Sequence, residues 1–381
     1  MKILALGGPG DTGQHAVRAA YEFDSIRQIV VGDRDGQKAA AFAGQFDAKV
    51  TATQLDVTDR AALVHELTQC DIVISTIGPY YQYGTLVLSA ALEAHCHYLD
   101  ICDDWEPTLD MLALHEDAIT AGITAIVGAG ASPGISNLLA VKAYGALDQV
   151  HTLHTVWGAG DPDKDQSEGD DEDVSQAVLE HWIQQLTGTI RLLRDGQHTE
   201  RRPLEEITVN YPGIGAVACH TVGHPEPVTL PRSLSGLRHS FNLMHMPAFV
   251  ISFLQTVGAK VDSGQLSIPA AAKELIQTLA PKEDHSTLAA TMRYLAHGLG
   301  KVMTRKKYLP ELAAVATGEQ DGRKAVVGAS LDGNFSGGIG PLTCIPTALI
   351  AEMISRREIT KPGVFAPEDG IDPDLFFQRL A

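Results

Sequence analysis

Cysteines are few in this sequence, and no pattern uses them. The five cysteines are scattered along 381 residues, their number is odd, and no two of them form a Cys-x-x-Cys pair. The sequence therefore predicts neither a disulfide framework nor a zinc site, and we expect no bound metal. Cysteine used in this way is typical of a reducing compartment, so we expect a cytoplasmic protein.

Long apolar runs and a signal-peptide pattern are also missing. No stretch approaches the roughly 20 apolar residues that a membrane-spanning helix requires. The first residues enter a strand-like segment directly, without the basic, apolar and small-residue order of a secretory signal. We therefore expect no membrane partner.

Positive charge is scarce as well. Lysine and arginine number 29 against 47 aspartates and glutamates, which gives a formal net charge of −18. Such an excess argues against nucleic acid or an anionic membrane surface as a partner. An anionic small-molecule substrate is still compatible, because it needs only one local arginine or lysine. A hydrophobic content of 44% over this length predicts two or three globular domains.

The N-terminal segment contains the most informative motif. A short apolar strand (residues 1–6) leads into Gly-x-Gly-x-x-Gly at residues 8–13, and a helix-forming segment follows at residues 14–23. A second apolar run then ends at Asp33. This order of strand, glycine turn, helix, strand and acid is that of a Rossmann dinucleotide-binding unit.

Each residue of the glycine turn has a predicted role. Gly8 permits the tight turn out of the strand, and Gly10, which has no Cβ, lets a pyrophosphate approach the backbone. Gly13 lets the helix pack closely against the strand. Asp11 and Thr12 lie at the helix N-terminus, where free N–H groups and the helix dipole attract phosphate.

Residues after later strands complete the predicted cofactor site. Asp33 suits both ribose hydroxyls of an adenosine and favours NAD, whereas Arg34 is a phosphate ligand and favours NADP. The sequence gives a slight preference for NAD and leaves both cofactors open. We expect Asp56 near the adenine, and Gly78 and Pro79 near a cofactor ribose.

Strand-like and helix-like segments alternate through residues 1–140, which indicates a doubly wound parallel sheet. Ligands of such sheets bind past the carboxyl ends of the strands, so the loops there should meet at one edge. The strand segments after the first are residues 29–33, 50–56, 71–77, 97–101 and 124–127.

The pattern changes in the second part of the chain. An Asp-Gly turn at residues 320–323 predicts a β-hairpin between residues 313–317 and 325–331. Residues 228–230 are also predicted as a strand. Residues 161–173 carry so many acids that we expect a solvated loop.

These segments predict an α/β protein of two domains. Residues 1–129 and about 336–381 are expected to form a Rossmann domain with a doubly wound parallel sheet. Residues 130–335 are expected to form a second, mixed α+β domain built on an antiparallel sheet, with a helix at residues 285–298.

Several short segments, spread over nearly the whole chain, form a recognisable set. They are Asp-Ile-Val-Ile-Ser-Thr-Ile-Gly-Pro (71–79), His-Tyr-Leu-Asp (97–100), Ser-Pro-Gly-Ile-Ser-Asn (132–137), Gly-His-Pro-Glu-Pro-Val-Thr-Leu-Pro-Arg (223–232), Ile-Pro-Thr-Ala-Leu-Ile-Ala-Glu-Met (345–353) and Pro-Gly-Val-Phe-Ala-Pro-Glu (362–368). Together they resemble the saccharopine dehydrogenase-like family of NAD(P)-dependent oxidoreductases. The resemblance implies a Rossmann domain with an inserted substrate and dimerisation domain, redox chemistry at a C–N bond, and a homodimer.

Acids past the fifth strand are catalytic candidates. Asp100 and Asp103 lie where the nicotinamide end is expected, and a carboxylate there stabilises a cationic iminium or takes its proton. Asp100 is equally compatible with a structural acid that caps the next turn. Asn137, at a helix start on the same edge, either caps that helix or binds the cofactor carboxamide or a substrate carboxylate.

Other candidates come mainly from the second domain. His224 is a catalytic candidate because a histidine shuttles protons near neutral pH. Arg232 would clamp a substrate carboxylate, and Glu226 lies between the two as a substrate ligand. Tyr80 is a candidate for the wall of the substrate pocket. A folding role for the segment with His224 is equally plausible.

The sequence thus favours an NAD(P)-dependent oxidoreductase that acts on the C–N bond of a small amine, amino acid or imine. Two alternatives stay open: a reductase of a C=C or C=O bond in a non-amino substrate, and a non-catalytic nucleotide-sensing protein. A short-chain dehydrogenase is disfavoured, because none of the nine tyrosines has a lysine four residues later to lower its pKa.

Overall fold

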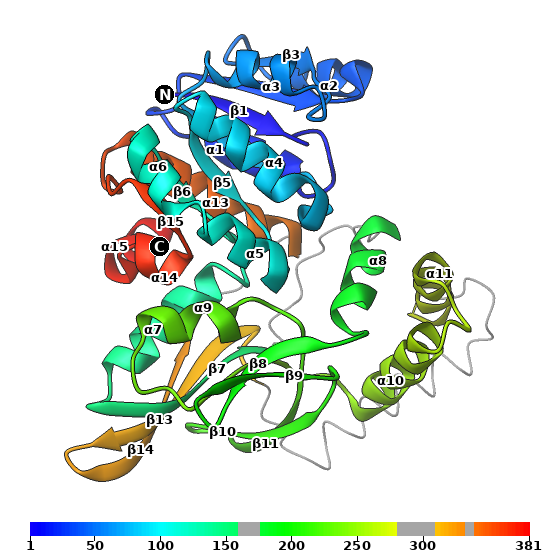
Figure 1. Ribbon diagram of the computed structural model, residues 1–381, viewed down its shortest axis with the longest axis vertical. Helices are drawn as coiled ribbons and strands as arrows, with labels where there is room; N and C mark the ends of the chain where they lie inside the picture. Colours follow the sequence, from blue (N-terminus) through cyan, green and yellow to red (C-terminus); the bar gives the residue numbers. More distant parts are fainter. Residues whose placement is uncertain (159–175, 280–308, 332–338) are drawn as a thin grey trace.

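The structure is a computed structural model, and it describes residues 1–158, 176–279, 309–331 and 339–381. Two sheets lie one above the other in Figure 1, the first formed mainly by the N-terminal part of the chain and the second by the middle part. The acidic residues 161–173 and the helix predicted at residues 285–298 lie outside the described residues.

The first sheet is entirely parallel. Its seven strands follow the order β15-β6-β5-β4-β1-β2-β3, so the strand order reverses on either side of β1. Such a switch point is where open α/β sheets bind their ligands. The strands are β1 (Lys2–Leu6), β2 (Gln28–Asp33), β3 (Val50–Gln54), β4 (Ile72–Ser75), β5 (His97–Asp100), β6 (Thr124–Ile126) and β15 (Gly363–Phe365).

Helices cover both faces of this sheet, as the predicted doubly wound fold requires. Side chains of α1 (Gly13–Tyr21), α2 (Gly36–Ala43) and α13 (Ile339–Ser355) share one apolar core with one face of the strands. The other face packs against α3 (Arg60–Leu67), α4 (Tyr80–Glu93), α5 (Trp105–Leu112) and α6 (His115–Ala121). Central strands such as β4 are therefore apolar on both sides, which explains their continuous hydrophobic sequences.

The C-terminal part of the chain returns to the first sheet. After the second sheet has formed, α13 packs against α1, and β15 pairs in parallel with β6. Two short helices, α14 (Pro367–Gly370) and α15 (Pro373–Leu380), end the chain. In Figure 1 these red elements lie between the two sheets, beside α7.

The second sheet is mixed rather than antiparallel. Six strands follow the order β10-β11-β12-β7-β13-β14, and β8 joins β12 to β9. The pair β12–β7 is parallel, so the expectation of an antiparallel sheet is wrong at this one pair. The strands are β7 (Gln149–Trp157), β8 (Ile190–Arg194), β9 (Gln197–Arg201), β10 (Glu206–Tyr211), β11 (Gly215–Thr221), β12 (His239–Met244), β13 (Leu312–Gln320) and β14 (Arg323–Ser330).

Helices of the second half connect the two sheets. The buried helix α7 (Ile135–Gly145) packs on β7 and β13, and its apolar side chains join the same core as the first sheet. Helix α9 (Glu226–Ser233) packs on β12 and β8. Helices α8 (Gln176–Gln185), α10 (Ala248–Asp262) and α11 (Ile268–Leu279) stand at the side of the sheet (Figure 1).

Two local predictions had opposite outcomes. The hairpin is confirmed: β13 and β14 pair around Asp321 and Gly322, whose φ values of +52° and +69° are typical of a two-residue I′ turn. The strand predicted at residues 228–230 is wrong, because these residues belong to α9. Prolines at the first helical positions favour the helix there and outweigh the β-branched side chains.

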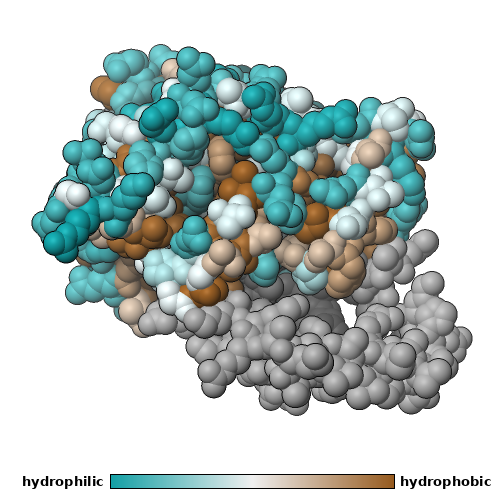
Figure 2. Space-filling view, turned by 90° about the horizontal axis from the view of Figure 1, so that it is seen from below, coloured by the Kyte–Doolittle hydropathy of each residue, from teal (hydrophilic) through white to brown (hydrophobic). Residues whose placement is uncertain are grey.

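Among the helices of the described ranges, none combines the length and apolar character that crossing a membrane requires. Seen from below, hydrophilic side chains cover most of the periphery, and hydrophobic side chains gather across the middle beside the residues drawn in grey (Figure 2).

The close approach of α1 to β1 predicts a large cost for a Cβ at Gly13. That Cβ would lie 2.2 Å from the carbonyl oxygen of Gly7 and 2.6 Å from the hydroxyl of Thr76. We expect Gly13→Ala to lower the free energy of unfolding by about 1–3 kcal/mol in a denaturant titration. Gly145→Ala is the matched control, because a Cβ on that helical glycine meets nothing within 4 Å. Equal effects of the two substitutions would contradict the packing argument.

Candidate active site

The glycine turn after β1 is shaped to accept a phosphate. Gly7 has a φ of +73°, and the N–H of Gly10 donates to its carbonyl at 2.9 Å. A Cβ on Gly10 would meet only that carbonyl oxygen, at 3.1 Å, so the space in front of Gly10 is otherwise open. The left-handed conformation that favours glycine in this turn is at Gly7, and Gly8, for which the sequence predicts the tight turn, has no positive φ.

The start of α1 adds N–H groups to this turn. Thr12 precedes the first helical residue, and no side chain caps the helix. Asp11 is exposed and uses its carbonyl to accept from Gln14. First-turn N–H groups without a side-chain acceptor attract phosphate oxygens. The turn thus fits the pyrophosphate of a dinucleotide.

The predicted adenosine residues meet at one edge of the first sheet. One carboxylate oxygen of Asp33 accepts from the N–H of Asp35 at 2.8 Å, whereas Arg34 is exposed and lines a shallow pocket with residues of α2 and β3. Asp56 accepts from the N–H and hydroxyl of Thr58, and Arg34 lies close enough to lower the pKa of Asp56 further. Arg34 is therefore within reach of a ligand at this edge.

Of the predicted residues that follow β4, Gly78 and Pro79 lie in a loop, whereas Tyr80 is buried. Gly78 and Pro79 lie in the loop between β4 and α4, and a Cβ on Gly78 would meet nothing within 4 Å. Tyr80 is buried in the first core, and its hydroxyl donates to the carbonyl of Ser75 at 3.2 Å. Its side chain thus points into the domain, away from a position in which it would line a substrate pocket.

Asp100 is buried and bonded to its own domain. One carboxylate oxygen accepts from the N–H groups of Cys102 at 3.0 Å and Gly128 at 2.7 Å, and the other accepts from the hydroxyl of Tyr98 at 2.7 Å. Burial raises the pKa of Asp100 to about 6, although these three hydrogen bonds oppose the rise. The carboxylate fastens the loops after β5 and β6, as the structural alternative for this acid proposes.

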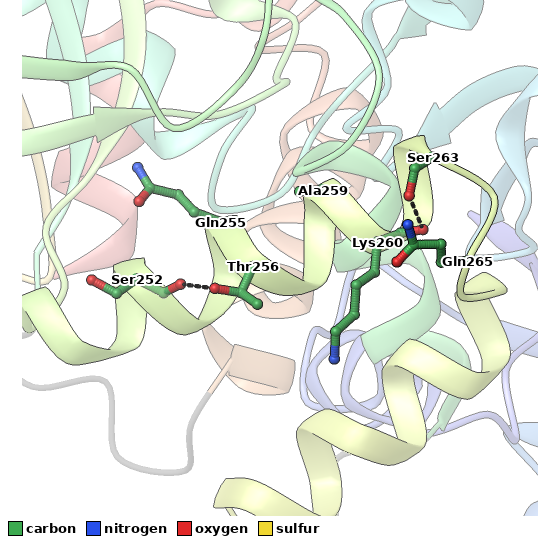
Figure 3. Close-up of a pocket in the computed structure, with 7 residues that line it drawn as sticks. All are labelled: Ser252, Gln255, Thr256, Ala259, Lys260, Ser263 and Gln265. Carbon is green, nitrogen blue, oxygen red and sulfur yellow. Dashed lines mark hydrogen bonds between the residues drawn. The ribbon is translucent and has the colours of Figure 1, made fainter.

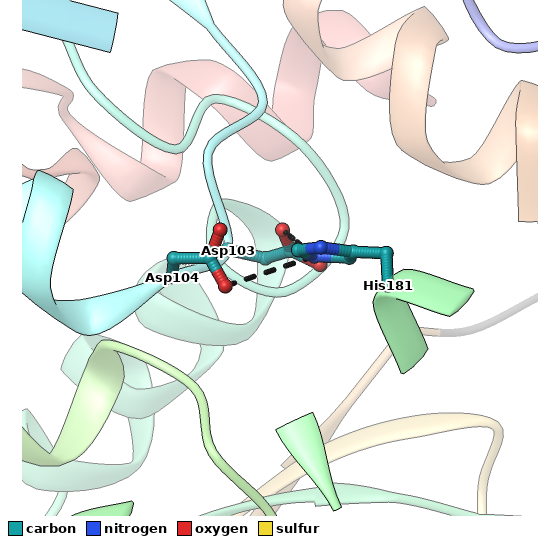
Figure 4. Close-up of side chains that lie close together, drawn as sticks. All are labelled: Asp103, Asp104 and His181. Atoms are coloured by element: carbon teal, nitrogen blue, oxygen red, sulfur yellow. Dashed lines mark hydrogen bonds and ion pairs between the residues drawn. The ribbon is translucent and has the colours of Figure 1, made fainter. Parts of the chain in front are cut away.

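Asp103 lies in the same loop, and its carboxylate faces the second half of the chain. Its Oδ1 is 2.8 Å from Nε2 of His181, which α8 contributes. Asp104 is 3.8 Å from the same nitrogen, and Figure 4 shows both carboxylates turned toward the imidazole ring. The side chains of Asp103 and His181 are 26% and 27% exposed, so both groups are accessible from solvent.

Charge keeps this histidine protonated. Burial by itself lowers the pKa of His181, but the charge and hydrogen bond of Asp103, with the charge of Asp104, raise it to about 9. Burial raises the pKa of Asp103, but His181 outweighs burial and lowers it below the ordinary value. Burial and the charge of Asp103 raise the pKa of Asp104 to about 6.

The ligand atoms of these three residues lie within 4.8 Å of one another, which is a geometry that a metal ion could also use. A metal needs the lone pair on the histidine nitrogen. Nε2 of His181 lies at hydrogen-bond distance, 2.8 Å, from Oδ1 of Asp103, so we interpret the cluster as an ion pair with a second acid beside it.

A buried amide links this pair to the other predicted histidine. Gln185, one helical turn after His181, donates from Nε2 to the carbonyl of Asp103 at 3.3 Å. Its Oε1 accepts from Nε2 of His224 at 3.2 Å. His224 is 8% exposed, and its other nitrogen lies 3.3 Å from the hydroxyl of Ser132.

The contacts continue to a fully buried carboxylate. Glu226 is 0% exposed, and its Oε1 accepts from the hydroxyls of Ser132 and Ser136 and from the amide of Asn242. Its Oε2 is 3.9 Å from Nδ1 of His224. The structure thus brings Asp103, His224 and Glu226 into one polar line, from the carboxyl edge of β5 to the interior of the second half.

Two predicted residues lie outside this line. Asn137 is fully buried: its Oδ1 accepts from the N–H of Gly134, and its Nδ2 donates to Glu368 at 2.7 Å. Both ends of its amide are therefore engaged at the start of α7. Arg232 is exposed near the C-terminus of α9, at the opposite end of this helix from Glu226.

The sequence prediction missed the residues that bridge the two halves. His181 and Gln185 come from α8, and Asp104, Ser136 and Asn242 complete the polar line. The one available signal was a histidine and a glutamine four residues apart on an amphipathic helix, which places both on one helical face.

A second surface pocket lies on α10, apart from these residues. It is lined mostly by polar side chains of α10 and the turn that follows (Figure 3). Lys260 of this pocket pairs with Glu274 of α11 at 3.0 Å. None of its lining residues is among the predicted site residues.

Comparison with known proteins assigns the N-terminal part of the chain, residues 3–126. Residues 3–126 match the family model described as the saccharopine dehydrogenase NADP binding domain. The chain is 36% identical over 124 residues to saccharopine dehydrogenase [NADP(+), L-glutamate-forming] of Schizosaccharomyces pombe, and 33% identical over 150 residues to the Saccharomyces cerevisiae protein of the same name. These matches cover 32% and 39% of the chain, but only 25% and 31% of the relatives.

The fold comparison extends over the whole chain. The structure superposes on apo saccharopine dehydrogenase (L-Glu forming) from Saccharomyces cerevisiae with a TM-score of 0.59 and 16% identity, covering 99% of this chain and 96% of that one. Residues 3–126 belong to this NADP binding domain family, and beyond them the likeness is one of fold. Sequence likeness is concentrated in the part of the chain that forms most of the first sheet, and the second half shares the fold.

The ion pair between the two halves predicts a pH-dependent contribution to stability. A raised pKa means that His181 stabilises the fold fully below its ordinary pKa of 6.5, and that this contribution disappears as pH rises through about 9. We expect His181→Gln to lower the melting temperature most near pH 6 and hardly at all near pH 10. Scanning calorimetry over this range is the measurement, and His151→Gln, at an exposed position on β7, is the control. A deficit that does not change with pH would contradict the ion pair.

Proposed function

We propose that this protein is an oxidoreductase that uses a nicotinamide dinucleotide to reduce an imine or oxidise an amine at a C–N bond. The observation that carries the proposal is the polar line from Asp103 through His181 and His224 to Glu226, which begins at the carboxyl edge of the dinucleotide-binding sheet. The fold shared with saccharopine dehydrogenase supports it, because that enzyme's name describes redox chemistry on an amino acid.

The charge of the accessible part of the site supports an amine as substrate. Asp103 and Asp104 are both partly exposed and share one cationic partner, His181, so the cluster carries a net negative charge when both acids are ionised. A carboxylate beside the reacting carbon stabilises an iminium cation. A substrate that develops positive charge on nitrogen therefore suits this edge better than one that develops an oxyanion.

The residues of the chain would manage the proton of the reaction. The bound dinucleotide supplies hydride to the imine carbon or takes it from the amine carbon. In the reductive direction the electrons of the C=N π bond move to nitrogen, and nitrogen takes one proton. His181 holds a proton at Nε2 beside two carboxylates, and Gln185 links it to His224, so these residues are the proposed proton source.

We propose NADP(H) as the preferred cofactor. The sequence alone gave a slight preference for NAD because of Asp33. The family model is described as NADP binding, and the two yeast relatives are named as NADP(+) enzymes. Arg34 is exposed beside the pocket at the end of β2, where it suits a ribose phosphate.

The same proposal covers the organisation of the protein. We propose a cofactor domain of residues 1–129 and about 336–381, and a substrate domain between them. The pairing of β15 with β6 supports this division. A homodimer and a cytoplasmic location remain proposals that follow from the resemblance and from the cysteine usage.

Cofactor preference is tested by substituting the exposed arginine. We expect Arg34→Ala to weaken binding of NADPH at least about tenfold and binding of NADH less than about threefold, because only NADPH carries the 2′-phosphate. Fluorescence titration of the reduced cofactors measures both affinities. Arg27→Ala, at the other end of β2, is the control. Tighter binding of NADH by the unaltered protein would reverse the assignment.

The reaction class is tested by turnover. Cofactor absorbance should change with amines, amino acids or mixtures of a carbonyl compound and an amine, and Asp103→Asn should lower kcat about 100-fold or more. Asp110→Asn, at an exposed position on α5, is the control. Turnover of C=C or C=O substrates alone would favour the alternative reductase. Tight cofactor binding without any turnover would favour a nucleotide sensor.

A further inference from the structure

Glu226 differs from the other acids of the site in its burial. It is the first residue of α9, and its side chain is 0% exposed. A carboxylate in this position is costly unless each oxygen has a partner. Its location at a helix N-terminus is favourable, but this interaction does not saturate the two oxygens.

The two carboxylate oxygens have unequal surroundings. Oε1 accepts from Ser132, from Ser136 at 2.7 Å and from Asn242 at 2.9 Å. Oε2 is buried and has no hydrogen-bond partner among the described residues. The ring nitrogen Nδ1 of His224 faces it at 3.9 Å. One oxygen of Glu226 thus anchors the side chain, and the other is directed at an imidazole.

The opposite side of the ring defines where His224 keeps its hydrogen. Nε2 lies 3.2 Å from Oε1 of Gln185, and an amide oxygen only accepts. The Gln185 amide takes this orientation because its Nε2 donates to the carbonyl of Asp103 at 3.3 Å. Nε2 of His181 lies 3.1 Å from the same amide nitrogen, but its N–H is directed at Oδ1 of Asp103, 2.8 Å away. The neutral ring therefore carries its hydrogen on Nε2, and its unprotonated Nδ1 faces Ser132 and Glu226.

We infer that Glu226 is a positioning residue that acts through His224: it holds the ring from behind and stabilises the proton that arrives at Nδ1, while Gln185 fixes the tautomer. A second proton on the ring forms an N–H bond at Nδ1 and places a cation beside Oε2, which supplies the missing partner of the buried carboxylate. The inference rests on the proposed function only for the use of this proton in catalysis. It replaces the expectation that Glu226 binds the substrate.

Other charged groups also lie around the imidazole ring of His224. Asp103 and Asp104 approach from the loop after β5 and lie within electrostatic reach of His224. His181 approaches from α8 on the far side of Gln185 and is itself a cation. The first two are acids and the third is a cation, and Glu226 is the acid that faces Nδ1.

Nuclear magnetic resonance of the full chain with isotope-labelled histidine tests this arrangement without any substrate. The nitrogen shifts of His224, assigned by their loss in His224→Gln, should show the Nε2–H tautomer. Glu226→Gln keeps the size of the side chain and removes its charge. We expect it to lower the proton affinity of His224 about tenfold, which moves the titration midpoint down by about one pH unit.

Three further variants complete the test. Glu226→Asp keeps the charge and should restore most of the midpoint, and Glu319→Gln, at an exposed position on β13, should leave it unchanged. Gln185→Met removes the acceptor at Nε2 and should mix the two tautomers, which keeps the test informative if Glu226 variants fold poorly. An Nδ1–H tautomer, or a midpoint that Glu226→Gln leaves unchanged, overturns the inference.

Kinetics separates this inference from the proposed function. If Glu226 acts through His224, Glu226→Gln lowers kcat and shifts its pH profile, with KM changed less than about twofold. If Glu226 binds the substrate, KM rises and the pH profile stays in place, which overturns the inference. A protein that shows the expected titrations but turns over no amine refutes the proposed function and leaves the histidine arrangement standing.

Discussion

The site depends on the buried carboxylate of Asp100, which does not itself point into the site. Asp100 accepts from the N–H groups of Cys102 and Gly128, the first from the loop after β5 and the second from the loop after β6. The first loop carries Asp103 and the second carries Ser132. A single side chain with three donors thus sets the course of both loops, and the polar line between the two sheets starts from positions that Asp100 holds.

The two halves meet through polar groups that complete one another. Asp103 lies at the edge of the parallel sheet, and α8 contributes two partners to it, the protonated His181 and the amide of Gln185. Behind them, His224 and Glu226 belong to the second half alone. The charged groups at the sheet edge are therefore accessible to solvent, whereas the carboxylate at the start of α9 is fully buried. A buried group must find its hydrogen-bond partners inside the protein.

Local chemistry was predictable from the sequence, and contacts between distant segments were not. The glycine turn, the acids past β5 and the Asp-Gly hairpin were found because their physical requirements lie within a few residues. Asp103 and His181 are 78 positions apart, and no periodicity connects them. The direction of a side chain was not predictable either. Asp100 and Tyr80 point into the core, and their positions just past a strand in the sequence do not reveal this. In α9 the prolines at the helix start outweighed the Val-Thr-Leu sequence that indicated a strand.

The late addition of β15 to the first sheet has a mechanical consequence. The chain leaves that sheet after β6 and returns to its neighbouring position at β15, so the second sheet is attached at two points that lie side by side. The returning segment also packs on α7, and Glu368 accepts a hydrogen bond from Asn137 at the start of that helix. The C-terminal residues therefore fasten the beginning of the second half to the first sheet, through a core that both halves share.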